Sequence, residues 1–380
     1  MTPRPTVISL FSGGGGLDLG LAAAGFDILY ESDIDQKSCN TLAQNGRIAK
    51  SHGLSGFENS VVKTADIRDI SGSEILEAVN KDRFDVDVLS GGPPCQAFSV
   101  FGKRKGTGDQ RGQLSFEYRR ILGEIAPRVF VFENVAGILT VENGETYKRL
   151  LEELSQPVEG LGYRIFANRL NAQDYCVPQS RDRVIIIGVR SDVVEQNGIS
   201  SVDIRPTSSE DGSGGLQKWR TVNDAFRSLP PLKVNSVDET NTPNHHGRRH
   251  SDGIIERYAN LGYGERDGKT RINKLYPDKP SFTIVVGSDA GGGKGHVHPF
   301  EPREVTPRES ARIQTFPDWW FFTGTVRDEI RQVGNAVPAL LGFEIGNTLR
   351  KQVFNLRSVP LKMGLKRLGQ EHLFQADLDS

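Results

Sequence analysis

Short apolar runs alternate with clusters of glycine, proline and charged residues through the first half of the chain. Between the first two runs, a glycine-rich turn leads into a predicted helix from about Leu17. Strands joined by helical segments predict an α/β fold with a Rossmann-like sheet. The runs with the length and composition of buried β-strands are residues 7–11, 28–30, 84–89, 129–132 and 184–189.

The pattern changes near Ser191. From there to about Phe300 the chain is rich in Gly, Ser, Asn, Asp and Arg, and strands no longer alternate with helices. A chain of 380 residues can hold one large domain and a smaller one, so this interval predicts a separate, loop-rich domain. After Val353, basic residues among leucines predict a short amphipathic helix.

A cysteine follows the third apolar run. In the segment GGPPCQAFS, residues 91–99, the glycines allow a sharp turn and the prolines fix the direction of Cys95, as a nucleophile requires. The alternative is a small buried hydrophobic residue. Glu133 follows the fourth run, and Arg181 and Arg183 stand before the fifth with the spacing of one strand face. Because sites in open α/β sheets form at strand ends, we expect these groups to share one pocket.

The first turn has the features of a nucleotide cradle, because glycines let a ligand approach the backbone and the following helix N-terminus favours a carboxylate or phosphate. Asp33 lies at the spacing of an acid that binds ribose hydroxyls, and Asp66 can reach an adenine amino group. This order of elements predicts a nucleoside cofactor and leaves NAD and S-adenosylmethionine both open. The glycines are Gly13, Gly14, Gly15 and Gly16.

Composition narrows the possible partners and the compartment. The net charge of −1 argues against a wholly basic nucleic-acid binder, so any contact with a nucleic acid needs local basic patches. Three cysteines without CxxC spacing predict neither disulfides nor a zinc site and fit a reducing compartment. The histidines of segments 244–250 and 287–299 lack a regular ligand spacing, so we expect no metal. With no signal peptide and no apolar run near the roughly 18 residues of a membrane span, we expect a cytoplasmic protein without membrane contact.

Seven short motifs follow one another over roughly residues 7–340. They are FSGGGG at Phe11, SDID at Ser32, PPCQ at Pro93, ENV at Glu133, QDYCVPQSRDR at Gln173, REVTPRESARIQTFP at Arg303 and QVGNAVP at Gln332. Together they resemble the motifs of DNA (cytosine-5)-methyltransferases of bacterial restriction-modification systems. The resemblance implies a Rossmann-like S-adenosylmethionine-dependent catalytic domain and a smaller target-recognition domain.

The resemblance also implies a division of the chain. Residues 1–190 would bind the cofactor and catalyse, and residues 191–325 would form the target-recognition domain with its scaffold motif. Residues 326–352 would return to complete the catalytic domain, with residues 334–349 resembling the helix that rejoins it. Residues 353–380 would form a C-terminal tail.

The resemblance implies a reaction for the residues at the strand ends. A thiolate at Cys95 would attack C6 of a cytosine flipped out of the duplex, at a cost of about a few kcal/mol, and so make C5 nucleophilic. Glu133 would hydrogen-bond N3 and N4, and Arg183, with Arg181 close by, would hold O2. Methylation, loss of the C5 proton and release of Cys95 would leave 5-methylcytosine.

For the cofactor S-adenosyl-L-methionine, the resemblance places the glycine turn and Phe11 at the methionine part, Asp33 at the ribose, and Asp66 with Ile67 at the adenine. Two residues depart from the family. Asp33 stands where Glu is usual, which shortens the ribose contact by one methylene, and Cys176 stands where Gly is usual, which adds a side chain to a turn. The further pocket residues would be Ile34, Pro93, Leu114, Asn335 and Val337.

Polar and basic residues around these motifs are the expected contacts to double-stranded DNA. The glycine-rich and basic segment 102–112 cannot pack a core, and is either a surface loop or a loop that closes over DNA. The expected DNA-contacting residues are Ser99, Lys103, Arg104, Lys105, Gln179, Arg248, Arg249 and Lys294.

The resemblance further implies a monomer of bacterial or phage origin, with a cognate restriction endonuclease that forms no stable complex with it. Two other functions stay open, namely a tRNA cytosine-5 methyltransferase on the same scaffold and a DNA-binding regulator without catalysis. No pattern in the loop-rich interval translates into a recognition sequence.

Overall fold

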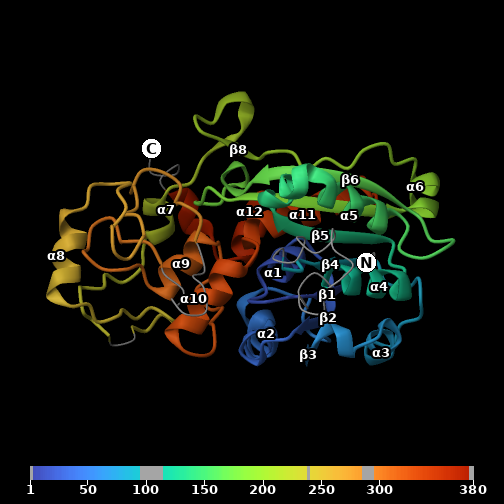
Figure 1. Ribbon diagram of the computed structural model, residues 1–380, viewed down its shortest axis with the longest axis horizontal. Coiled ribbons are helices and arrows are strands. Elements are labelled where there is room, and N and C mark those ends of the chain that lie inside the picture. The colour runs from blue at the N-terminus through green and yellow to red at the C-terminus, as the bar shows by residue number, and fades with distance from the viewer. Residues whose placement is uncertain (1–2, 95–113, 238–239, 285–294, 376–380) are drawn as a thin grey trace.

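The computed structural model describes residues 3–94, 114–237, 240–284 and 295–375, and its centre is a seven-stranded sheet (Figure 1). The strand order is β3-β2-β1-β4-β5-β7-β6. Strand β7 runs antiparallel to β5 and β6, and the other neighbouring strands are parallel. The expected α/β fold with a Rossmann-like sheet is confirmed. The strands are β1 (Thr6–Leu10), β2 (Asp27–Asp33), β3 (Val61–Thr64), β4 (Val88–Gly91), β5 (Val129–Val135), β6 (Tyr163–Asn171) and β7 (Asp182–Arg190).

Helices cover both faces of this sheet (Figure 1). Successive strand residues point to opposite faces, so in β5 Val129 and Val131 join one apolar cluster while Phe130 and Phe132 join the other. The first cluster includes residues of α1, α2 and α11, and the second includes residues of α3, α4 and α5. These helices are α1 (Gly16–Ala23), α2 (Gln36–Ala49), α3 (Gly72–Ala78), α4 (Leu114–Ile125), α5 (Glu145–Ser155) and α11 (Ala339–Gln352).

The loop-rich interval holds few regular elements. The apolar cluster that begins at Val7 of β1 continues through Leu275 and Val305 to Ile313, so one core joins this part of the chain to the sheet. The domain boundaries therefore stay a proposal. The elements from residue 191 on are α6 (Ser191–Asn197), β8 (Ser208–Ser209), β9 (Gln217–Lys218), α7 (Val222–Phe226), α8 (Asp252–Asn260), α9 (Pro307–Ile313), α10 (Val326–Asn335) and, after α11, α12 (Leu361–Arg367). Among the helices in the described ranges, none has the length and apolar character needed to cross a membrane.

Two expected elements differ from the structure. The strand expected at residues 84–89 begins only at Val88, because Phe84 has a left-handed backbone (φ 79°) and its exposed ring packs against the guanidinium groups of Arg83 and Arg190. The single helix expected at residues 334–349 is two helices, because Pro338 has no N–H to donate and the chain is extended before it. That break places the turn between α10 and α11 beside the glycine turn.

Candidate functional site

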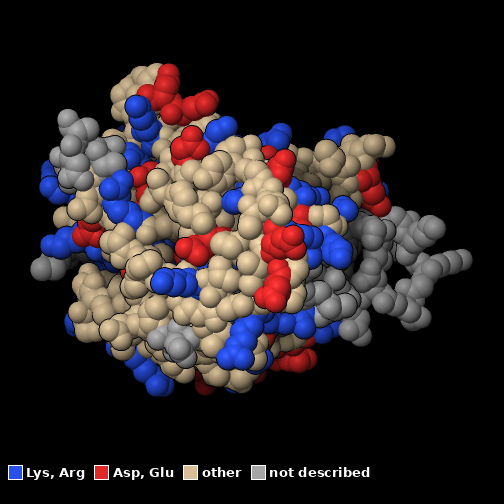
Figure 2. Space-filling model, turned by 90° about the vertical axis from the view of Figure 1, so that its left-hand side faces the viewer, with Lys and Arg blue, Asp and Glu red and all other residues tan. Residues whose placement is uncertain are grey.

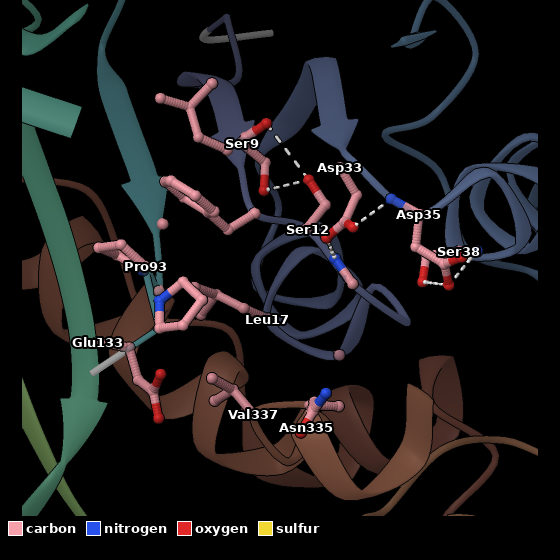
Figure 3. A pocket seen from close by; sticks show the side chains of 18 of the residues that line it. Ser9, Ser12, Leu17, Asp33, Asp35, Ser38, Pro93, Glu133, Asn335 and Val337 are labelled. Atoms are coloured by element: carbon pink, nitrogen blue, oxygen red, sulfur yellow. Dashed lines mark hydrogen bonds between the residues drawn. The ribbon is translucent and has the colours of Figure 1, made fainter. Parts of the chain in front are cut away.

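A cavity of about 700 Å³ lies at the carboxyl ends of β1, β2, β4 and β5 (Figure 3). Its volume is in the range of small-molecule binding sites. The predicted catalytic residues Glu133, Arg181 and Arg183 line it. The predicted cofactor residues that line it are Phe11, Gly13, Gly16, Asp33, Ile34, Asp66, Ile67, Pro93, Leu114, Asn335 and Val337.

The other two glycines of the turn, Gly14 and Gly15, have packing roles. A Cβ on Gly14 would lie 3.1 Å from the carbonyl oxygen of Gln332, and its own carbonyl accepts a 3.1 Å hydrogen bond from Trp320 Nε1. Gly15 is left-handed (φ 82°), and a Cβ there would lie 2.7 Å from both Leu42 and Trp320. These glycines therefore let segments from the end of the chain close over the turn.

Gly16 at the start of α1 is the tightest position of the turn. A Cβ there would lie 2.1 Å from the carbonyl oxygen of Val337, which lines the same cavity. We expect Gly16→Ala to lower the free energy of unfolding by about 1–3 kcal/mol or more, and to weaken S-adenosylhomocysteine binding at least about tenfold, as measured by denaturant titration and calorimetry. The control is Gly253→Ala in α8, where a Cβ meets no atom within 4 Å. Equal effects of the two substitutions would contradict this explanation.

Two acids of the cavity are held by nearby groups. Asp33 accepts 2.9 Å hydrogen bonds from the backbone N–H groups of Gly13 and Asp35, so it ties the end of β2 to the glycine turn. Burial raises the pKa of Asp33, and these backbone hydrogen bonds oppose the rise. Asp66 accepts hydrogen bonds from the backbone and guanidinium groups of Arg68, and the pKa of Asp66 is lowered by these bonds.

The second half of the cavity holds an ion pair. Glu133 lies in β5, and its Oε1 is 2.7 Å from Nε of Arg183 in β7, the neighbouring antiparallel strand. A Cβ on Gly92 would lie 2.8 Å from Glu133 Oε2, so this glycine leaves room for the carboxylate. Asn134 donates a 3.1 Å hydrogen bond to the carbonyl of Pro93 and so ties this turn to β5. The two groups predicted from separate strand ends therefore lie in contact.

Arg181 has a different environment from that of Arg183. Its side chain is buried, with 1% of the residue exposed, and it donates hydrogen bonds of 2.8 and 3.1 Å to the carbonyls of Gly334 and Ala336. Burial lowers the pKa of Arg181, the charge of Arg183 lowers it further, and Glu133 opposes both. Arg181 thus joins the start of β7 to the turn between α10 and α11, which makes it a positioning residue in this structure.

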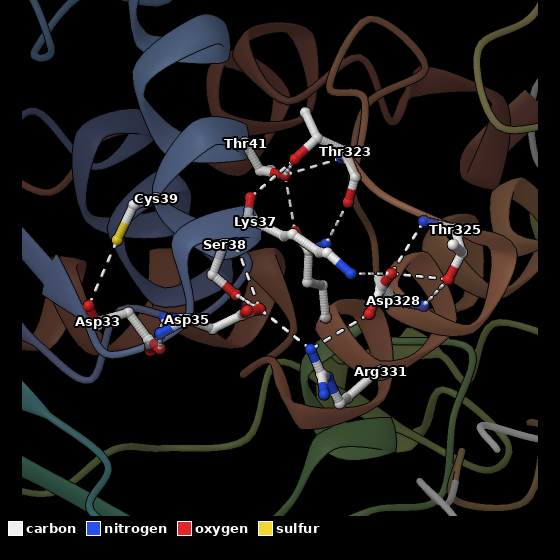
Figure 4. Close-up of polar contacts among 12 residues, drawn as sticks. Asp33, Asp35, Lys37, Ser38, Cys39, Thr41, Thr323, Thr325, Asp328 and Arg331 are labelled. Carbon is white, nitrogen blue, oxygen red and sulfur yellow. Dashed lines mark hydrogen bonds and ion pairs between the residues drawn. The ribbon is translucent and has the colours of Figure 1, made fainter. Parts of the chain in front are cut away.

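A polar network missed by the sequence motifs closes one side of the cavity (Figure 4). Arg331 of α10 contacts Asp35 at 3.2 Å and Asp328 at 3.3 Å, and Lys37 of α2 contacts Asp328 at 2.6 Å. Arg331 and Asp35 both line the cavity. Burial opposes ionisation of Asp328, but its hydrogen bonds with Lys37 and Thr325 outweigh burial and lower its pKa. The sequence signal for this network was Arg331, which directly precedes the QVGNAVP motif.

The predicted DNA contacts are placed only in part. Gln179 is fully buried. Its Nε2 donates to Gln314 Oε1 at 3.0 Å, and its Oε1 accepts a hydrogen bond from the backbone N–H of Ile284. Its side chain therefore joins segments inside the protein. Arg248 is half-buried, 3.4 Å from Glu304, and Arg249 is exposed. On the face shown in Figure 2, Lys and Arg lie among Asp and Glu. The predictions for Cys95, Ser99, Lys103, Arg104, Lys105 and Lys294 lie outside the described residues.

Buried histidines have structural partners in the loop-rich part. His245 lies 3.0 Å from the Thr306 hydroxyl and 2.8 Å from the carbonyl of Pro230, and His298 accepts hydrogen bonds from two backbone N–H groups. In the part of the chain that the structure describes, no cluster of three or more His, Cys, Asp or Glu has the arrangement of a metal site.

The structure accommodates Cys176 at a position where the family usually has glycine. Its backbone is left-handed (φ 59°), the conformation for which glycine is the usual residue. The side chain is fully buried, and its backbone N–H donates a 2.8 Å hydrogen bond to Ser208 Oγ. The turn is therefore present despite the side chain.

Comparisons with known proteins agree with this geometry. The chain is 34% identical to the type II methyltransferase M.Eco47II of Escherichia coli over 90% of its own length and 78% of that protein. It is 31% identical to the type II methyltransferase M.FnuDI of Fusobacterium nucleatum, over 95% of this chain and 99% of that one.

Solved structures show the same fold. A structure described as a DNA modification methyltransferase encoded within an E. coli prophage superposes with a TM-score of 0.72 at 28% identity, over 93% of this chain and all of that one. The Dnmt2 methyltransferase of S. pombe, at 18% identity and a TM-score of 0.59, covers 92% of this chain and 99% of its own, and shares the fold. The profile of the family described as C-5 cytosine-specific DNA methylase matches residues 5–351. The chain belongs to this family and is an enzyme of the DNA (cytosine-5)-methyltransferase class.

Proposed function

We propose that the protein methylates cytosine at C5 within one short sequence of double-stranded DNA and so protects that DNA from a partner restriction endonuclease. The observation that carries the proposal is the contact between Glu133 and Arg183 beside the cavity of the glycine turn. A carboxylate and a guanidinium group at this place offer the polar edge of one base two complementary partners. The names of the type II relatives support the link to restriction.

The residues of the cavity fit S-adenosyl-L-methionine. The glycine turn brings the N-terminus of α1 to the cavity, where a carboxylate is favoured, and Asp33 and Asp66 supply acceptors for hydroxyl and amino groups. A Cβ on Gly16 would lie 2.1 Å from the carbonyl oxygen of Val337, so only glycine lets these two cavity-lining segments meet. When bound, the cofactor supplies an electrophilic methyl group.

The chain's own residues carry the other steps. The Cys95 thiolate forms a bond to C6 of the flipped cytosine, and the electron pair displaced from the C5–C6 bond makes C5 the nucleophile. Glu133 hydrogen-bonds N3 and N4 while Arg183 holds O2, and Arg181 fixes the segment that carries Arg183. After C5 is methylated, a base removes its proton, the C5–C6 double bond re-forms, and Cys95 leaves as the thiolate. One base is modified in each binding event, which suits a monomer.

Base-resolution bisulfite sequencing tests this proposal. DNA from a methylation-free host that expresses the chain should be modified at one short motif, and DNA from a host that expresses Cys95→Ala should not. DNA that contains 5-fluorocytosine should trap the wild type covalently and leave the variant free. A folded wild type that modifies no duplex cytosine would contradict the proposal, and methylation of tRNA in the same cells would then indicate the RNA substrate.

A further inference from the structure

A row of buried polar side chains crosses the centre of the sheet beneath α1. Ser9 of β1 is paired with Glu31 of β2 on one side and with Ser90 of β4 on the other. Paired residues of parallel strands point to the same face, and all three are at most 2% exposed. Asp18 of α1, 1% exposed, lies over this row. Its negative charge raises the pKa of Glu31, and the nearby Ser9 hydroxyl lowers the pKa of Asp18 itself.

The carboxylate of Asp18 is buried and forms no ion pair with the described residues. Neither of its oxygens accepts a hydrogen bond of good geometry from the described residues, although the nearby Ser9 hydroxyl lowers the pKa of Asp18, and neither Ser90 Oγ nor Glu31 Oε1 has a partner there. Burial raises the pKa of both Asp18 and Glu31, and their mutual repulsion raises that of Glu31 further. Burying the charged form of a carboxylate without a partner costs several kcal/mol, and a cationic group of a ligand placed beside it would offset that cost.

Asp18 and Ser9 both line the cofactor cavity. The other acids of the cavity are engaged: Asp33 accepts two backbone N–H groups, and Asp35, Asp66 and Glu133 each contact an arginine. Among the carboxylates of the described residues that line the cavity, Asp18 is therefore the one with neither an arginine nor a backbone N–H as partner.

The start of α1 offers two binding groups to the amino-acid part of the cofactor. Gly16 and Leu17 at the N-terminus of α1 line the cavity, and this end favours a carboxylate. An amino acid carries an ammonium group on the same carbon as its carboxylate, and Asp18 lies in the first turn of this helix. We propose that Asp18 is the residue that binds the α-ammonium group of the cofactor. This inference rests on the proposed function.

Calorimetry with two probes tests the inference. S-adenosylhomocysteine carries the α-ammonium group, and its deaminated analogue keeps the carboxylate and the nucleoside but lacks the amine. We expect the wild type to prefer S-adenosylhomocysteine about 10- to 100-fold, the range of one buried charge-assisted hydrogen bond. Asp18→Asn, which replaces the carboxylate with a neutral group of the same shape, should reduce this preference to less than about threefold and leave affinity for the deaminated analogue within about threefold of wild type.

The matched control is Glu344→Gln. Burial also raises the pKa of Glu344, to about 7, but this residue does not line the cavity, so the variant should keep the wild-type preference. If Asp18→Asn does not fold, as judged by its thermal melt, Asp18→Ser takes its place. An unchanged preference in either Asp18 variant would overturn the inference and leave the cofactor site intact. A wild type that binds neither probe would overturn the proposed cofactor site, and the inference with it.

Discussion

Glu133→Gln should lower the rate of methyl transfer by about 10²–10⁴-fold, the range that one positioned proton-transfer group contributes. Glutamine keeps the size of the side chain and can still hydrogen-bond, but it has no acidic proton to share with N3 of the base and no charge to pair with the guanidinium group that lies 2.7 Å away. The measurement is single-turnover transfer of labelled methyl groups to DNA, with enzyme in excess over the target. The affinities for DNA and S-adenosylhomocysteine should change less than about threefold.

Arg183 provides a second test of the same contact. If Glu133 and Arg183 hold one base together, the double variant Glu133→Gln/Arg183→Gln should be hardly slower than the worse single variant. A control at the exposed Glu145, as Glu145→Gln, should transfer methyl groups at the wild-type rate. Single effects that multiply in the double variant, or a Glu133→Gln rate within about threefold of wild type, would show that the two residues do not act on one base.

The sequence predicted the catalytic half of the site because its residues stand at the ends of apolar runs. Glu133 and Arg183 are 50 positions apart, yet each follows or precedes a strand that reads as a continuous buried run, and sheet geometry brings such ends together. The glycine turn was predictable for the same reason, since a strand, glycines and a helix occur in unbroken order.

The remaining parts depend on contacts that no local pattern encodes. Lys37 and Asp328 meet across 291 positions, and Arg331 reaches Asp35 across 296. The sequence shows Asp18 as a charged residue in an apolar helix. Its burial beside Ser9 and Glu31 depends on two strands that the local pattern does not bring together. Periodicity also could not place the strand start at Val88 or the helix break at Pro338. The first depends on the packing of Phe84 against two arginines, and the second on the extended backbone before the proline.

Arg181→Met should lower the free energy of unfolding by about 3–5 kcal/mol, the range seen when one partner is removed from a buried charged network. Methionine fills much of the volume but removes the donor to the carbonyl of Gly334 and leaves the carbonyl of Ala336 with only the 3.3 Å hydrogen bond from Gln314 Nε2 among the described residues. These carbonyls flank Asn335, which lines the cofactor cavity, so S-adenosylhomocysteine affinity should fall as well. Denaturant titration with and without S-adenosylhomocysteine measures both effects.

Arg205→Met separates this role from a general effect of losing an arginine. Arg205 is exposed, and its replacement should change the free energy of unfolding by no more than about 0.5 kcal/mol. If Arg181 contacted the base directly and had no part in the scaffold, Arg181→Met would be as stable as wild type and would lose only the rate of methyl transfer. A loss of stability shared with a loss of cofactor affinity instead identifies Arg181 as the link between β7 and the turn that closes the cofactor cavity.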